Sequence, residues 1–198
     1  MGKVTLTLLG VIVVAFLLQI AIPGFTQMFY LNPGNLQIWQ FVTSIFLHGG
    51  ITHILFNAYA LFLFGPILEQ RVGGRNFLSI FFIGGIAGNL LYWASALIGI
   101  TNSPALGASG AIYAIFGALA ILVPHLQLYI FGVIPMNIRH AAIMWIALEF
   151  LGSFNPASGI ASAAHLGGLV MGLALGKYFE GGAHSPVEQY YWRRKRQY

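Results

Sequence analysis

The sequence predicts an all-α membrane protein, a bundle of six transmembrane helices with a first loop that lies in the membrane interface. Three observations lead to this prediction. The chain is 58% hydrophobic and only 7% charged, whereas a soluble domain carries about 25% charged residues. Its apolar residues form six runs, each close to the roughly 20 residues that a spanning helix requires. All nine lysines and arginines lie next to alternate ends of these runs, on one side of the predicted membrane.

The six predicted spans follow one another along a single domain, residues 1–198. They cover residues 4–22, 50–69, 76–98, 108–124, 138–153 and 162–179. Gly, Pro, Asn and Ser in the segments between them are typical of turns. The first run follows Lys3 and exceeds the about 7–15 apolar residues of a signal peptide, so we interpret it as a retained span. The last run carries glycines at 168, 172 and 176, a stripe that permits close helix packing.

The basic residues predict the orientation of the chain. They are Lys3, Arg71, Arg75, Arg139, Lys177, Arg193, Arg194, Lys195 and Arg196. The positive-inside rule then places both termini in the cytoplasm, and we expect a multi-pass protein of a prokaryotic plasma membrane. The basic tail, residues 180–198, has the composition of a nucleic-acid or lipid patch. We interpret it as an orientation signal that also contacts anionic lipid, and expect no nucleic-acid partner. The first loop, residues 24–47, is uncharged and aromatic-rich, as suits the interface.

Polar side chains are predicted at one depth inside the bundle. Ser109, His53 and His165 lie 16, 16 and 12 residues from the cytoplasmic ends of their spans, which corresponds to roughly 18–24 Å at about 1.5 Å per residue. Asn57 shares a helix face with His53, and Tyr113 with Ser109, because each pair is four residues apart. Polar residues inside a membrane usually mark a pathway or a site. We therefore expect these side chains to surround one polar chamber.

Each of these residues, taken alone, is better explained by packing. His53 and Asn57 would then form an interhelical hydrogen-bond pair, Tyr113 a core aromatic and Ser109 a small-residue contact. Taken together they favour a nucleophile–base pair with oxyanion donors, because packing does not require such groups at one depth. The alternatives are a channel, a transporter, or a protein that binds transmembrane segments without catalysis.

Three segments resemble the signature segments of the rhomboid intramembrane serine proteases. They are "FLHGGITHILFN" (46–57), "GASGAIYAIFG" (107–117) and "AHLGGLVMGLALG" (164–176). They resemble, in order, a His-x-x-x-Asn on the second helix, a Gly-x-Ser-Gly that opens the fourth, and a His before a glycine stripe on the sixth. The spacing and predicted topology agree over the whole chain. One departure is visible at Trp39-Gln40, where the family often carries Trp-Arg.

The resemblance implies a role for each residue of the chamber. Ser109 would be the nucleophile and His165 the general base, and the backbone N–H of Ser109 would help to stabilise the oxyanion. The implied oxyanion and substrate-binding residues are His53, Asn57, Gly107 and Tyr113, with Tyr113 stacked against His165. The implied partners are the lipid bilayer and substrates with a transmembrane helix, namely single-span proteins cleaved near the outer membrane face. No cofactor or metal is expected.

The acidic residues predict a dyad rather than a triad. The chain has no cysteine, no aspartate and four glutamates. Glu149 is the one carboxylate in the outer half of the predicted bundle, and we expect it in a helix-packing or rim position rather than in a third catalytic role. We also expect residues 152–162 to cap the site and to lift with the fifth span when a substrate enters.

Overall fold

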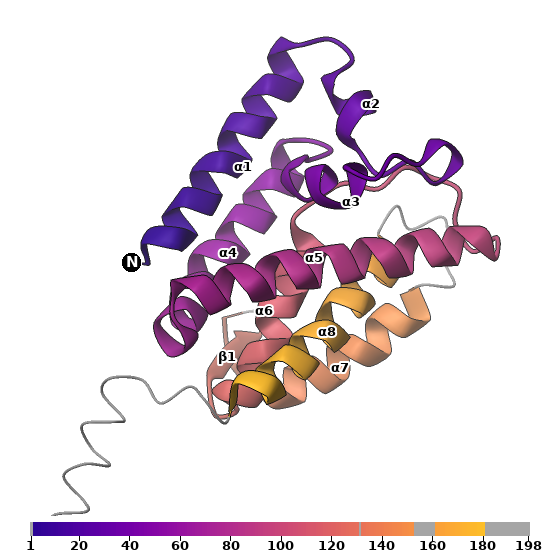
Figure 1. The fold of residues 1–198 in the computed structure, drawn as a ribbon. Helices are drawn as coiled ribbons and strands as arrows, with labels where there is room; N and C mark the ends of the chain where they lie inside the picture. The colour runs from indigo at the N-terminus through magenta and orange to yellow at the C-terminus, as the bar shows by residue number, and fades with distance from the viewer. Residues whose placement is uncertain (1, 131, 153–160, 181–198) are drawn as a thin grey trace, which may run out of the picture.

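The structure is a computed structural model that describes residues 2–130, 132–152 and 161–180. Among these residues, six helices of 14 residues or more form the bundle (Figure 1). They are α1 (Lys3–Ala21), α4 (Ile51–Val72), α5 (Gly74–Leu97), α6 (Ser109–Leu122), α7 (Ile138–Gly152) and α8 (Ser162–Glu180). Their bounds lie within three residues of the six predicted runs. In the described part of the chain, α1, α4 and α5 are long and apolar enough to cross a membrane. That all six helices cross it stays a prediction.

Shorter elements occupy two of the connections. The first loop contains α2 (Phe25–Phe29), η1 (Pro33–Asn35), α3 (Gln40–Thr43) and η2 (Ser44–Phe46). An antiparallel hairpin of β1 (Gln127–Ile130) and β2 (Ile134–Asn137) joins α6 to α7. The prediction of a simple turn in this last connection was wrong. Aromatic and β-branched residues on both sides of Gly132 favour paired strands, and Gly132 supplies the positive φ of the tight turn.

Helix α6 forms the centre of the bundle and packs against both α5 and α8 (Figure 1). Glycines allow the backbones of α6 and α8 to touch. A Cβ atom at Gly168 would lie 2.0 Å from the carbonyl oxygen of Gly110, and one at Gly172 would lie 2.1 Å from that of Ala114. No larger residue fits without moving a helix. The predicted glycine stripe of the last span is therefore confirmed as a close contact with α6.

Helix α6 alone is shorter than the hydrocarbon core is thick, so the predicted fourth span would have to include the segment before it. Its 14 residues rise about 21 Å at 1.5 Å per residue, against a hydrocarbon core about 30 Å thick. The segment before it is pinned to the first loop. Ala105 and Leu31 exchange two backbone hydrogen bonds of 2.9 Å, and the N–H of Gly107 donates to the carbonyl of Ser44 at 2.9 Å. Irregular backbone at membrane depth is tolerated where protein satisfies it in this way.

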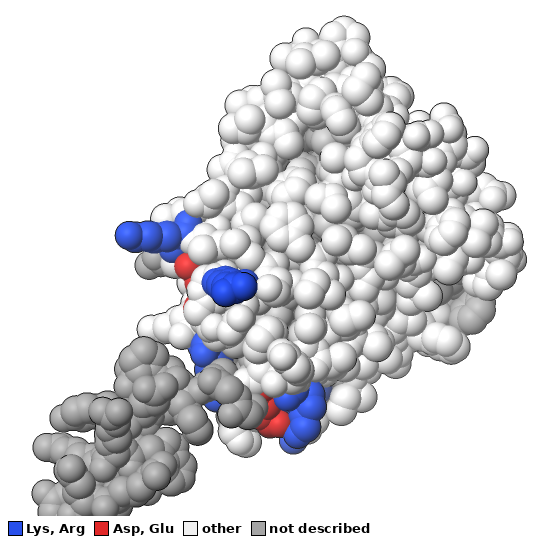
Figure 2. Space-filling model, in the orientation of Figure 1, with Lys and Arg blue, Asp and Glu red and all other residues white. Residues whose placement is uncertain are grey.

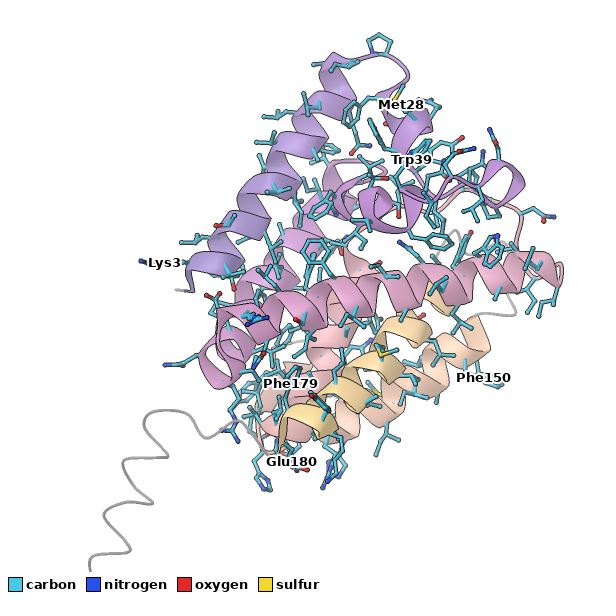
Figure 3. The ribbon with its side chains drawn as sticks, viewed as in Figure 1. Lys3, Met28, Trp39, Phe150, Phe179 and Glu180 are labelled. Atoms are coloured by element: carbon cyan, nitrogen blue, oxygen red, sulfur yellow. The ribbon has the colours of Figure 1, made fainter. Side chains whose placement is uncertain are left out.

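The two ends of the bundle differ in charge. In Figure 2 the visible lysine and arginine atoms gather at one end, and the rest of the face shown is almost free of charge. Figure 3 places Lys3 and Glu180 at this basic end and Trp39 and Phe150 at the opposite one. The side chains of α1 between the ends are mostly exposed and apolar, as a lipid-facing surface requires. The predicted basic tail beyond Glu180 lies outside the described residues.

Candidate active site

A serine and a histidine meet where α6 and α8 begin. Ser109 is the first residue of α6, and His165 lies in the first turn of α8. The close backbone contact between the two helices brings Ser109 Oγ to 2.7 Å from His165 Nε2. This is a short, strong hydrogen-bond distance. The structure therefore brings these two predicted residues into the arrangement that a nucleophile and its general base require.

A carboxylate contacts the other nitrogen of the same ring. Glu149 Oε1 lies 3.0 Å from His165 Nδ1, and the hydroxyl of Tyr113 donates to the same oxygen at 2.5 Å. Glu149 is only 8% exposed, so of the two expected positions it lies in helix packing and not at the rim. The depth calculation applied to the fifth span would have indicated this. Ten residues separate Glu149 from Arg139, which corresponds to about 15 Å, close to the depth of His165.

The imidazole of His165 is held in one orientation. Tyr113 stacks on it with ring centroids 4.5 Å apart and planes 8° from parallel. The stack restrains the ring face, and the carboxylate of Glu149 restrains its edge. Together they direct Nε2 towards Ser109.

His53 also points towards Ser109. The N–H of Gly49 donates to His53 Nδ1 at 3.2 Å, so the proton of the neutral ring lies on Nε2. A Cβ atom at Gly107 would lie 2.8 Å from both Cε1 and Nε2 of His53 and 3.6 Å from Ser109 Oγ. Gly107 has φ +134°, a conformation that favours glycine. The missing side chain leaves the N–H of His53 free access to the space beside Ser109.

Asn57 lies one turn further along α4 and is buried, with 6% exposure. Its amide donates to the backbone carbonyl of His53 at 2.9 Å. The alternative of an interhelical pair between these two residues does not hold, because this bond stays within α4. An amide nitrogen carries two protons, so one remains for a group in the cavity.

A cavity of about 780 Å³ joins these groups. Its walls include His53, Asn57, Ser109, Tyr113 and His165, together with residues 100, 101 and 103–106 of the loop before α6. Its volume lies within the range of ligand-binding sites. In the described residues no three His, Asp or Glu side chains converge as a metal site requires. The cavity therefore places a serine, a base and polar N–H donors around one substrate-sized space.

Buried amides hold the first loop against this site. Gln40 is 3% exposed, and its Oε1 accepts from the N–H of Asn32 at 3.1 Å and of Gln37 at 3.2 Å. Asn89 of α5 donates to Ser44 Oγ at 2.9 Å. Gln40 thus organises the loop by accepting backbone hydrogen bonds, although it departs from the family's Trp-Arg. Sequence reasoning did not identify Asn89 or Ser44, although an asparagine in an apolar span is itself a signal.

His48 packs behind the site. It is 2% exposed, and its ring lies 5.1 Å from that of His53. Among the residues that the structure describes, neither ring nitrogen of His48 has a hydrogen-bond partner. Burial lowers the pKa of His48 to about 4, and the nearby His53 adds to this effect. His48 is therefore neutral at pH 7.

The predicted cap over residues 152–162 falls mainly in the segment 153–160, outside the described residues. The ends that flank this segment do reach the site. Gly152 and Ser162 both line the cavity.

The sequence matches known proteins over most of its length. The model of one family, the Rhomboid domain, matches residues 35–180. The chain is 35% identical over 145 residues to YdcA of Bacillus subtilis, a protein assigned to the rhomboid proteases, and the match covers 73% of this chain and 69% of YdcA. It is 30% identical over 189 residues to the rhomboid protease GlpG of Serratia proteamaculans, covering 88% of this chain and 62% of GlpG. It is also 35% identical over 141 residues to the mitochondrial Rhomboid protein 1 of Saccharomyces cerevisiae, covering 69% of this chain and 40% of that protein.

Proposed function

Because the chain belongs to the rhomboid family, we propose that it is an intramembrane serine endopeptidase with Ser109 as nucleophile and His165 as general base. Its substrates are the transmembrane segments of single-span proteins, cleaved near the outer membrane face. The observation that carries this proposal is the 2.7 Å contact between Ser109 Oγ and His165 Nε2 in a cavity at the start of α6. The names of the relatives, which include rhomboid proteases, support it.

The reaction begins with proton transfer from Ser109 to His165. As Ser109 Oγ bonds to the scissile carbonyl carbon, its proton passes to Nε2, and the carbonyl oxygen takes up the electron pair. His165 then gives the proton to the leaving amine as the C–N bond breaks. A water molecule, activated by the same nitrogen, hydrolyses the acyl-enzyme and restores Ser109.

The start of α6 stabilises the oxyanion. The N–H groups of the first turn of a helix lack intrahelical partners, and the helix dipole favours negative charge there. The Nε2–H of His53 and the amide of Asn57 face the same cavity. One such donor is worth about 2.7–4 kcal/mol in serine proteases.

The position of the site predicts which substrates the protein cleaves. A transmembrane helix protects its peptide bonds by hydrogen bonding, so it must unwind before Ser109 attacks. Small or helix-breaking residues near the outer face lower the cost of unwinding. The basic end of the bundle (Figure 2) supports an orientation with both termini in the cytoplasm, which leaves Ser109 towards the outer side.

Labelling and cleavage test this function together. Purified protein is incubated with a panel of single-span substrates, and with a fluorophosphonate that labels activated serines. Cleavage and labelling of Ser109 are expected in the wild type. They are also expected in the control variant Ser79→Ala, because Ser79 lies near the start of α5, where its hydroxyl donates to the carbonyl of Arg75. Ser109→Ala should lose both, and His165→Ala should lose cleavage and slow labelling strongly. An adduct on Ser103 or Ser162, or cleavage by Ser109→Ala, would contradict the proposal.

A further inference from the structure

We infer that Glu149 is a positioning residue for His165, so that the site works as a Ser109–His165–Glu149 triad. This inference rests on the proposed function. It starts from three residues on three helices that two contacts join in a line. Ser109 Oγ lies 2.7 Å from His165 Nε2, and His165 Nδ1 lies 3.0 Å from Glu149 Oε1. The inference extends the two-residue mechanism derived from sequence, in which packing alone orients the imidazole.

The carboxylate determines which ring nitrogen of His165 carries the proton. An ionised carboxylate is an acceptor only, so the nitrogen that faces Glu149 must be the donor. The proton of the neutral ring is thereby held on Nδ1, and Nε2 is left with the lone pair that Ser109 requires. Stacking on Tyr113 fixes the plane of the ring but does not distinguish its two nitrogens. Glu149 therefore selects the tautomer of His165, which the stack on Tyr113 does not.

Glu149 also stabilises the charged form of His165. When Nε2 takes the proton of Ser109, the ring becomes an imidazolium beside a carboxylate only 3.0 Å away. Counting side-chain atoms alone, only 13% of His165 and 11% of Glu149 is exposed, so water screens their attraction little. The attraction exists only once the proton has moved. It therefore lowers the barrier of the reaction more than it strengthens substrate binding.

Tyr113 supports the carboxylate rather than competing with the histidine. Its hydroxyl donates to the same Oε1 atom that faces His165, and Ser162 donates to Glu149 as well. A buried carboxylate is costly unless donors surround it. Here donors come from α6 and α8, the two helices that carry Ser109 and His165. The same contacts would be made by a purely structural link between helices, so the test must separate the two roles.

Kinetic measurements on matched variants distinguish a positioning role of Glu149 from a purely structural link between helices. Glu149→Gln keeps the shape and removes the charge, and Glu149→Asp keeps the charge on a shorter side chain. The control is Glu69→Gln at the basic end, because Glu69 also accepts three hydrogen bonds, from Val4 and Thr5. We expect Glu149→Gln to lower kcat at least tenfold with little change in KM. Glu149→Asp should recover part of the loss, and Glu69→Gln should lower the melting temperature but not kcat.

The imidazole ¹⁵N spectrum of histidine-labelled protein provides a readout that does not depend on turnover. The His165 signals are assigned from the spectrum of His165→Asn. Neutral His165 should carry its proton on Nδ1 in the wild type, and Glu149→Gln should reduce that tautomer. A wild-type proton on Nε2, or a Glu149→Gln kcat within threefold of wild type with only the melting temperature lowered, would overturn the inference. A wild type that neither cleaves substrates nor labels Ser109 would instead overturn the proposed function, and the spectrum would still decide the role of Glu149.

Discussion

Replacing Gly107 by alanine is expected to slow catalysis and, separately, to add strain to the fold. The new Cβ atom would lie 2.8 Å from Cε1 and Nε2 of His53, whereas ordinary contact begins at 3.4 Å. The imidazole must therefore retreat by about 0.6 Å. In the proposed reaction, a displacement of this size would remove His53 from the position in which its N–H meets the oxyanion, because catalytic donors act over a narrow range of distance.

The expected loss is that of one oxyanion donor. This amounts to about 10²–10³ in kcat, or roughly 2.7–4 kcal/mol, with KM nearly unchanged because the oxyanion exists only in the transition state. The φ of +134° at Gly107 adds strain of about 1–3 kcal/mol to the folded state. That second cost appears in the melting temperature and not in turnover.

Gly99→Ala is the matched control. Gly99 also has a positive φ, +78°, but a Cβ atom there would meet nothing within 4 Å. It should lower the melting temperature and leave kcat unchanged. The assay is turnover number, KM and melting temperature for both variants and the wild type, with the single-span substrate panel. If Gly107→Ala keeps the kcat of Gly99→Ala, the clash with His53 does not reach the chemistry and the reasoning is refuted.

Three further predictions concern the surroundings of the site. Asn57→Ala should lower kcat by about 10–10³-fold, or 1.4–4 kcal/mol, with little change in KM; a lowered melting point at unchanged turnover would make Asn57 structural only. Gly172→Val should destabilise the bundle by about 1–3 kcal/mol in thermal unfolding, because its Cβ meets the carbonyl of Ala114 at 2.1 Å. Gly10→Val on α1, where nothing lies within 4 Å, should change stability by less than about 1 kcal/mol. Burial holds the pKa of His48 at about 4, below its unfolded value of about 6.5, so the unfolded chain binds the proton first. Stability should therefore fall as pH drops from about 6.5 towards 4, by about 2 kcal/mol at pH 5; an equal fall in His48→Asn would contradict this origin.

Helix positions were predictable from the sequence because local signals mark them. Pro23 follows the end of α1 by two residues, and Gly73, with φ +81°, separates α4 from α5. Counting residues from the basic ends was enough to place Ser109, His53 and His165 at one depth. Each of these signals is contained in a single segment of the chain.

What could not be predicted depends on contacts between segments. The link from Glu149 to His165 requires the rotation of α7 about its axis, and apolar residues cover most of this helix, so no polar stripe indicates which face turns inwards. The bond from Asn89 to Ser44 joins residues 45 positions apart, whose pairing no local pattern reveals. The hairpin between α6 and α7 was missed because its strands are only four residues long, too short for a clear alternation.

The backbone contact between α6 and α8 has a consequence for how the protein responds to its lipid. Gly168 lies one turn after His165, and Gly110 directly follows Ser109, so a main-chain contact sets the distance between the proposed nucleophile and its proposed base. Side chains change rotamer easily, but two touching backbones have no such freedom. Changes in bilayer thickness should therefore tilt the outer helix α1, which meets its neighbours through side chains, and leave the Ser109–His165 distance unchanged. We expect the rate of fluorophosphonate labelling to stay constant from thin to thick bilayers while the rate of cleavage of transmembrane substrates varies. That result would mean that lipid thickness acts on substrate entry and not on the Ser109–His165 pair. A labelling rate that varied with thickness would refute this.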